Sequence, residues 1–277
     1  MSSAMVTILD GPLGTELDAR GVPTPAPLWS AYALDHAPEV VSTIHRDYAA
    51  AGATVHTANT FRTKRRSAGD RWEVLARRAV ALAREAAPRG HHVAGSVAPL
   101  EDCYRPERSP TNPRPEHHEL CEVLADAGVD LILCEAFPHV GEALVALEEG
   151  LRTGLPVWVA FTAGPEANLL TPEEVEAGAR EAAARGASAV LVNCTPATRT
   201  LSYVEKLARV GIPFGAYANA GAMEEGIGWG DATRGADVYA DLAEAWIRAG
   251  ATIVGSCCGT GPRHVRAIAA RARGVRP

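Results

Sequence analysis

The stretch from Ala251 to Thr260 reads ATIVGSCCGT and places two adjacent cysteines, Cys257 and Cys258, between glycines. It begins with an apolar run that is typical of a buried strand. Gly261 and Pro262 follow, and a glycine N-cap with proline at the first helical position is a common helix start. The cysteine pair therefore lies where a strand gives way to a helix.

Adjacent side chains on an extended strand point to opposite faces, so both thiols can reach one point only if the backbone turns sharply. Gly255 and Gly259 bracket the pair and are expected to allow that turn. Two convergent thiols form half of a tetrahedral zinc site, and a third would complete a catalytic site with one open position. We expect the third to be Cys194, because residues 190–195 read VLVNCT and also end an apolar strand.

The remaining cysteines, Cys103, Cys121 and Cys134, are interpreted as small buried hydrophobic residues. A disulfide within the vicinal pair is the alternative to a metal site. Residues 1–5 show no pattern of a secretory signal, and in a reducing compartment metal binding or catalysis is the preferred interpretation of such a pair.

Composition is that of a globular enzyme: 277 residues, 47% hydrophobic and 22% charged. The formal net charge of −6 has no clustered basic residues behind it, which argues against a nucleic-acid surface. The densest basic patch, Arg62 to Arg66, is interpreted as a solvated loop. No apolar run is long enough to span a bilayer, so we expect a cytoplasmic protein. The sequence leaves open whether it is a monomer or a homo-oligomer.

Apolar runs of four to eight residues alternate with longer stretches rich in Ala, Glu and Arg, a pattern that predicts a parallel sheet covered by helices. Glycines before several of the runs suit the left-handed end of a helix. The number of runs predicts a single (βα)8 TIM barrel domain over residues 1–277. The eight expected strands lie near Thr7–Asp10, Thr54–Ala58, Val93–Ser96, Asp130–Glu135, Val157–Thr162, Ala189–Cys194, Phe214–Ala218 and Thr252–Ser256.

Catalytic groups of such barrels lie where the strands end, and two of the expected strands end in the carboxylic acids Asp10 and Glu135. Together they suit an ammonium group or acid–base work, although a strand-end Asp is also a common helix cap. The proline-rich segment from Cys103 to Pro115 predicts irregular structure beside the same face. It is interpreted as a stiffened surface loop, with a lid or partner contact as the alternative.

These motifs together resemble the homocysteine S-methyltransferase family over residues 10–268. The resemblance implies a zinc-dependent barrel in which Cys194, Cys257 and Cys258 hold the metal and the substrate thiol takes the open position. It also implies that Asp10 and Glu135 bind the amino acid end of homocysteine. The motifs that carry it are Asp10-Gly11 with Gly14-Thr15, Asn59-Thr60-Phe61, Gly95-Ser96, Asn193-Cys194 and Gly255-Ser256-Cys257-Cys258-Gly259-Thr260.

Residues 27–31 and 217–219 look most like the subgroup that uses S-methylmethionine or S-adenosylmethionine as donor. Ser256, Gly261 and Ala222 depart from residues common in the family, which leaves the zinc ligands intact. The residues expected to bind substrates are Asp10, Asn59, Ser96, Glu135, Trp29 and Asn219.

The chemistry expected is methyl transfer from a sulfonium donor to homocysteine, giving methionine. A free thiol has a pKa near 8.5, so zinc would be needed to keep the thiolate at neutral pH. Trp29 or Trp229 could offer an aromatic face to the sulfonium. The alternatives are another thiol or selenol acceptor, betaine as donor, or a zinc- or thiol-binding subunit without catalysis.

Overall fold

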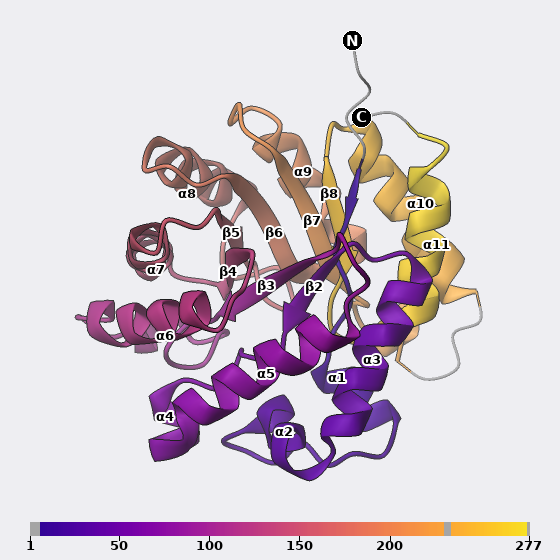
Figure 1. Cartoon of the computed structure of the whole chain (residues 1–277). Helices are drawn as coiled ribbons and strands as arrows, with labels where there is room; N and C mark the ends of the chain where they lie inside the picture. Colours follow the sequence, from indigo (N-terminus) through magenta and orange to yellow (C-terminus); the bar gives the residue numbers. More distant parts are fainter. Residues whose placement is uncertain (1–5, 230–233, 276–277) are drawn as a thin grey trace.

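Eight parallel strands form one sheet that closes on itself (Figure 1). The computed structural model describes residues 6–229 and 234–275. The strand order is β1-β8-β7-β6-β5-β4-β3-β2, and a parallel bridge between Leu9 and Val55 joins β1 to β2. The predicted (βα)8 barrel is therefore confirmed. The strands are β1 Thr7–Ile8, β2 Val55–Ala58, β3 His92–Val97, β4 Leu131–Phe137, β5 Val157–Phe161, β6 Ala189–Pro196, β7 Phe214–Asn219 and β8 Ile253–Ser256.

Helices surround the barrel and shield its outer face (Figure 1). α8 begins with Thr171 as N-cap and Pro172 at the first helical position, and Thr171 and Glu174 form a reciprocal capping box. Among the described residues, none of the helices is long and apolar enough to cross a membrane. The main helices are α3 Pro38–Ala51, α5 Trp72–Ala86, α6 Arg114–Asp126, α7 Val140–Arg152, α8 Pro172–Ala184, α9 Leu201–Leu207, α10 Gly235–Arg248 and α11 Pro262–Ala272, with short α1 Gly14–Ala19, α2 Ala33–His36 and α4 Arg65–Ala68.

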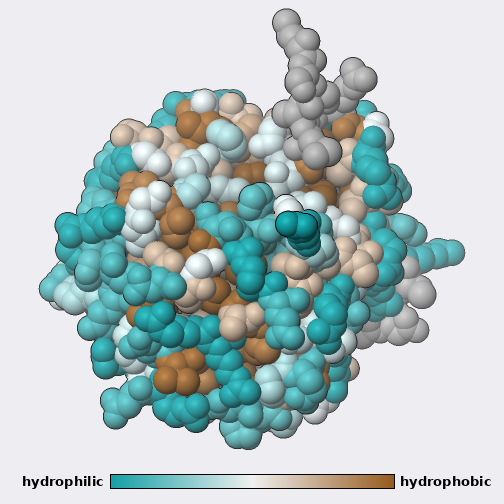
Figure 2. Space-filling model, in the orientation of Figure 1, coloured by the Kyte–Doolittle hydropathy of each residue, from teal (hydrophilic) through white to brown (hydrophobic). Residues whose placement is uncertain are grey.

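Apolar side chains fill the barrel interior below the strand ends. We call them the interior plug: Leu9, Val55, Ala94, Leu131, Leu133, Ala160, Ala189, Leu191, Tyr217 and Ile253. Each fully buried leucine of this kind contributes roughly 1.5 to 3 kcal/mol of apolar burial. The second and larger core lies between the strands and the helices. On the face shown in Figure 2, apolar residues are scattered among hydrophilic ones.

Two sequence expectations change in the structure. Only Gly259 of the bracketing glycines turns the chain, with φ of +81°, whereas Gly255 lies in β8. A Cβ on Gly255 would come within 2.7 Å of the Leu9 Cβ, so this glycine is needed for close packing of β8 on β1. The segment from Cys103 to Pro115 is less irregular than expected, because it contains a 3-10 turn over Pro106–Arg108 and enters α6 at Arg114.

Candidate active site

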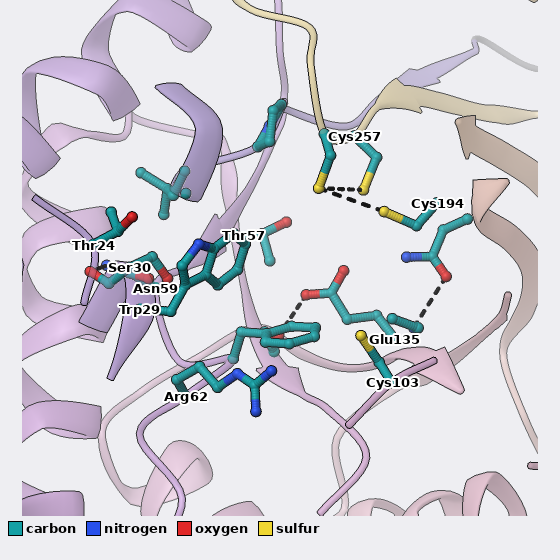
Figure 3. A pocket seen from close by; sticks show the side chains of 18 of the residues that line it. Thr24, Trp29, Ser30, Thr57, Asn59, Arg62, Cys103, Glu135, Cys194 and Cys257 are labelled. Atoms are coloured by element: carbon teal, nitrogen blue, oxygen red, sulfur yellow. Dashed lines mark hydrogen bonds between the residues drawn. The ribbon is translucent and has the colours of Figure 1, made fainter. Parts of the chain in front are cut away.

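The strand ends surround a cavity of about 640 Å³ at the carboxyl-terminal face of the barrel (Figure 3). As the sequence predicts, residues at or near the ends of four different strands line it: Asp10, Ser96, Glu135 and Cys194. This face is where barrel enzymes place their chemistry, and the volume is that of a small-molecule site. The cavity is therefore the candidate active site.

Three sulfur atoms converge at one end of this cavity. The Cys194 Sγ lies 3.6 Å from the Cys258 Sγ, and the Cys257 Sγ lies 4.0 Å from the Cys258 Sγ. All three sulfurs lie within 4.8 Å of one another. We call Cys194, Cys257 and Cys258 the sulfur cluster. It joins two βα junctions that are more than sixty positions apart in the sequence.

The backbone around the sulfur cluster is held by specific hydrogen bonds. Cys194 adopts a left-handed φ of 49°, and the Asn219 side-chain amide donates to its carbonyl at 2.8 Å. The Cys257 amide donates to the Ala218 carbonyl at 2.8 Å, while the Thr260 hydroxyl donates to the Cys257 carbonyl at 2.7 Å. A non-glycine residue persists in this backbone region only where its surroundings fix it. The thiols are thus pre-positioned by the fold.

The sulfur cluster favours a negative charge on one of its members. Cys194 and Cys257 both direct their thiols at the Cys258 sulfur, and these hydrogen bonds lower the pKa of Cys258 well below that of an ordinary thiol. A thiolate is the form that binds a metal. The cluster thus offers an incoming cation a sulfur that is held as a thiolate.

The three sulfurs have the spacing of a tetrahedral metal site. With zinc–sulfur bonds of 2.3 Å, two ligands of a regular tetrahedron lie about 3.8 Å apart. The separations of the Cys258 sulfur from the Cys194 and Cys257 sulfurs, 3.6 Å and 4.0 Å, bracket this value. The donor set therefore fits Zn²⁺, and an ion held by these three sulfurs would keep one coordination position for a ligand from the cavity.

Asp10 lies in the cavity wall between β1 and β2. One carboxylate oxygen accepts from the Thr57 amide at 2.8 Å and the other from the Thr57 hydroxyl at 2.9 Å. Burial and the nearby charge of Glu135 raise the pKa of Asp10 to about 8, against the lowering effect of the Thr57 hydrogen bonds. His45 and His56 are fully buried behind it, and burial lowers the pKa of these imidazoles to about 3 and about 4. They are neutral and supply no balancing charge.

Glu135 lies in the opposite wall of the cavity, near the end of β4. Two hydroxyl groups hold its carboxylate in position. The Ser96 hydroxyl donates to one carboxylate oxygen, and the Tyr217 hydroxyl donates to the other at 3.0 Å. Burial raises the pKa of Glu135 to about 7 despite these hydrogen bonds. Two acids with raised pKa values in one cavity favour an incoming cation, because its charge would stabilise both carboxylates.

Two of the other predicted substrate residues line the cavity, and one does not. Trp29 and Asn59 are in its wall, and the Asn59 amide donates to the Ser30 carbonyl at 2.8 Å. Asn219 lies behind the wall, where its oxygen accepts from the Gly221 amide and its nitrogen holds the Cys194 backbone. Trp229, considered for the sulfonium, is outside the cavity and donates its indole N–H to the Gly221 carbonyl.

A second group of potential metal ligands, Asp10, His45 and His56, lies within 4.8 Å in the core behind the cavity. Both of the carboxylate oxygens of Asp10 already accept hydrogen bonds from Thr57. This group contains no thiol, and its two histidines lie behind the cavity wall, so it is separate from the sulfur cluster.

Sequence reasoning missed several residues of the site. Thr57 fixes Asp10, and the Asn193 side-chain oxygen accepts from the Ala136 amide at 3.0 Å, which ties β6 to β4 beside the cluster. Cys103 is buried, as predicted, but in the cavity wall and not in either apolar core. Arg62 also lines the cavity. Asn193 belongs to a motif named above, but nothing in the local sequence gives the contacts of these residues, because their partners come from distant strands.

Comparison with known proteins agrees with this geometry. The family model of homocysteine S-methyltransferases matches residues 7–272. Homocysteine S-methyltransferase 4 from Zea mays is 33% identical, over 96% of this chain and 89% of that protein. An S-methylmethionine–homocysteine S-methyltransferase from Pongo abelii is 29% identical, over 97% and 79%. The crystal structure of the homocysteine methyltransferase MmuM from Escherichia coli in its metallated form superposes with a TM-score of 0.81 at 26% identity, covering 96% of each chain. The chain belongs to the homocysteine S-methyltransferase family.

Proposed function

We propose that this barrel transfers a methyl group from S-methylmethionine to the thiol of homocysteine, with Zn²⁺ bound by Cys194, Cys257 and Cys258. The observation that carries the proposal is the sulfur cluster, three thiols at tetrahedral spacing that face one cavity. Family membership supplies the reaction class, and a relative named for both substrates supports the donor and the acceptor.

Zinc held by the three cysteines would bind the acceptor thiol in its deprotonated form and so keep its sulfur nucleophilic near neutral pH. The thiol proton would pass to solvent on binding. The acceptor sulfur then forms a bond to the methyl carbon while the bond from that carbon to the donor sulfur breaks. The bonding electrons stay on the donor sulfur, which becomes a neutral thioether, so no acid is needed to protonate the leaving group.

The chain's own residues orient the two substrates. Asp10 and Glu135 are expected to bind the homocysteine ammonium, since both carboxyl groups face the cavity and lack a cationic partner among the described residues. Trp29 meets Phe61 edge to face, with ring centroids 5.9 Å apart, and both rings line the cavity. Their π faces suit a sulfonium cation.

The test is a parallel assay of homocysteine with S-methylmethionine, S-adenosylmethionine and betaine, together with metal analysis of the purified protein. We expect about one zinc per chain and the fastest transfer from S-methylmethionine. Dialysis against a chelator should abolish transfer, and added zinc should restore it. A full rate in protein that retains no metal would contradict the proposal. A panel of other thiols and selenols tests the acceptor.

We also infer that residues 1–277 form one domain, because all described strands belong to one closed sheet. The cytoplasm is the compartment we propose, because the sulfur cluster must stay reduced to bind a metal and all six cysteines are free thiols. Limited proteolysis that yields one resistant core and fractionation of cells check these two statements.

A further inference from the structure

Arg62 differs from the other residues of its basic patch. The sequence predicts that the patch from Arg62 to Arg66 is a solvated loop, and the structure contradicts this for two members. Lys64 is buried with its ammonium donating to the Pro99 carbonyl, and Arg62 is partly buried in the cavity wall. Arg65 and Arg66 are exposed as expected. The turn after β2 thus directs one arginine into the active site.

The Arg62 guanidinium has no acidic partner among the described residues. Its Nε is buried without a hydrogen-bond partner, and its central carbon lies 5.5 Å from the centre of the Phe61 ring. Arg66 also lines the cavity, but it pairs with Glu116 at 2.7 Å and with Glu101. A buried N–H without an acceptor costs stability, so its presence in a cavity indicates an acceptor that arrives with a ligand.

The position of Arg62 separates it from the homocysteine end of the site. Figure 3 shows its side chain across the cavity from Cys257, with Trp29 and Glu135 between them. In the same view Glu135 lies nearer the sulfur cluster than Arg62 does, and the Asp10 carbonyl accepts from the amide of Ser256, the residue before Cys257, at 3.2 Å. The region beside Arg62 therefore suits the second substrate, the methyl donor.

A donor that carried only its sulfonium charge would be repelled by a partly buried guanidinium. A donor with a carboxylate would gain a charge-assisted hydrogen bond from Arg62, while its sulfonium could lie against Trp29 or Phe61. We propose that Arg62 binds the carboxylate of the methyl donor and so selects sulfonium compounds that carry a carboxylate. This inference rests on the proposed methyl transfer.

The experiment compares S-methylmethionine with its decarboxylated counterpart, (3-aminopropyl)dimethylsulfonium, as methyl donors to homocysteine. The variants are Arg62→Gln and Arg62→Lys, with Arg66→Gln and Arg108→Gln as matched controls that each remove one other cavity-lining arginine charge. Where the decarboxylated compound is too slow as a donor, its competitive inhibition constant against S-methylmethionine replaces its KM. Metal content and the KM for homocysteine are measured for every variant.

We expect Arg62→Gln to raise the KM for S-methylmethionine about 10- to 100-fold, the range for a lost hydrogen bond to a charged group. The constant for the decarboxylated compound should stay level or fall, because the variant also removes the repulsion between the guanidinium and that cation. The KM for homocysteine should change less than about threefold, since homocysteine does not use this contact. Arg62→Lys should restore part of the affinity, because it keeps the charge but not the planar fork. The two controls should change every constant less than about threefold, within the small effect of exposed charges.

An equal loss for both donors, or a larger loss in either control variant, would overturn the assignment of Arg62. So would an active wild-type protein that does not distinguish the two donors. If no sulfonium compound methylates homocysteine in protein loaded with zinc, the proposed function itself has failed. The two failures are therefore distinguishable.

Discussion

The rim of the barrel and the interior plug below it are built by opposite rules. The plug is apolar, and the described strands keep regular parallel pairing around it. The rim buries two carboxyl groups and the Cys194 thiol beside two half-buried thiols, and three of its lining residues, Trp29, Ala136 and Cys194, adopt left-handed backbone angles. Each of these rim features costs stability. The difference indicates that the plug and the outer core stabilise the fold, while the rim holds a costly but functional arrangement.

The largest expected effect of a change at the rim is loss of the metal. Structural zinc sites bind with about 10 to 16 kcal/mol. We expect Cys258→Ala to lower metal retention and methyl transfer at least about 1000-fold, because one of three ligands is gone. The unfolding free energy of the metal-free protein should change by about 1 kcal/mol or less, since little packing is lost. Metal analysis, rate assays and chemical denaturation measure the three quantities.

The control is Cys121→Ala, which removes a fully buried thiol of the larger core between the strands and the helices. It should keep metal and activity while losing about 1 to 2 kcal/mol of stability. If both variants lost metal to the same degree, the sulfur cluster would not be the metal site.

The second effect concerns the plug. Leu131→Ala truncates a side chain that is 5% exposed in β4, several residues below Glu135. Deleting a buried leucine costs about 2 to 5 kcal/mol of unfolding free energy. Urea denaturation measures this loss, and the folded variant should bind metal and transfer methyl groups at close to the normal rate. Loss of metal without loss of stability would contradict the proposal that the plug stabilises the fold while the rim holds the functional groups.

The third effect tests the acids of the rim. Glu135→Gln removes a carboxylate proposed to bind the homocysteine ammonium, so the KM for homocysteine should rise about 10- to 100-fold. The KM for the donor should change little. Glu142→Gln is the matched control, because Glu142 is also buried but does not line the cavity, and its carboxylate accepts hydrogen bonds from the Ser109 hydroxyl and the Leu100 amide. An equal effect of the two variants on homocysteine would argue for a general loss of packing.

The smallest effect is a pH dependence of binding. Burial raises the pKa of Asp10 to about 8, and a carboxyl group must be ionised to attract an ammonium. Affinity should therefore rise with pH up to about 8 and level off above it, by up to about tenfold per unit while the acid is protonated. Calorimetry with methionine, which has no thiol, between pH 6 and 9 measures it. Asp10→Asn should flatten the profile, and an unchanged slope would assign the titration to another group.

Local patterns predicted the periodic parts of the molecule. Each of the eight expected strands is present to within about two residues at its ends, because buried parallel strands are short apolar runs and their helices end in glycine. The cysteine motif was equally visible, since two adjacent cysteines in a glycine frame after a strand can direct two thiols at one metal. The residues that start α8, Thr171, Pro172 and Glu174, likewise form a local capping pattern.

The errors arose where a residue's environment comes from elsewhere in the chain. Arg62 and Lys64 look like surface residues in the sequence, yet the turn after β2 places one in the cavity and the other against Pro99. Asn219 was expected to contact substrate but holds the Cys194 backbone instead of lining the cavity. Neither contact has a local sequence signal.

By itself the sequence determined the number of strands, the closed barrel and the three thiols at two strand ends, because periodicity and turn residues act over a few positions. Only the tertiary structure decided that these thiols lie within 4.8 Å, that Tyr217 and Ser96 aim Glu135, and that Arg62 faces the cavity. The physical reason is that barrel closure fixes which strand ends meet. Burial then sets the charge state of each side chain, and both depend on neighbours far away in the chain.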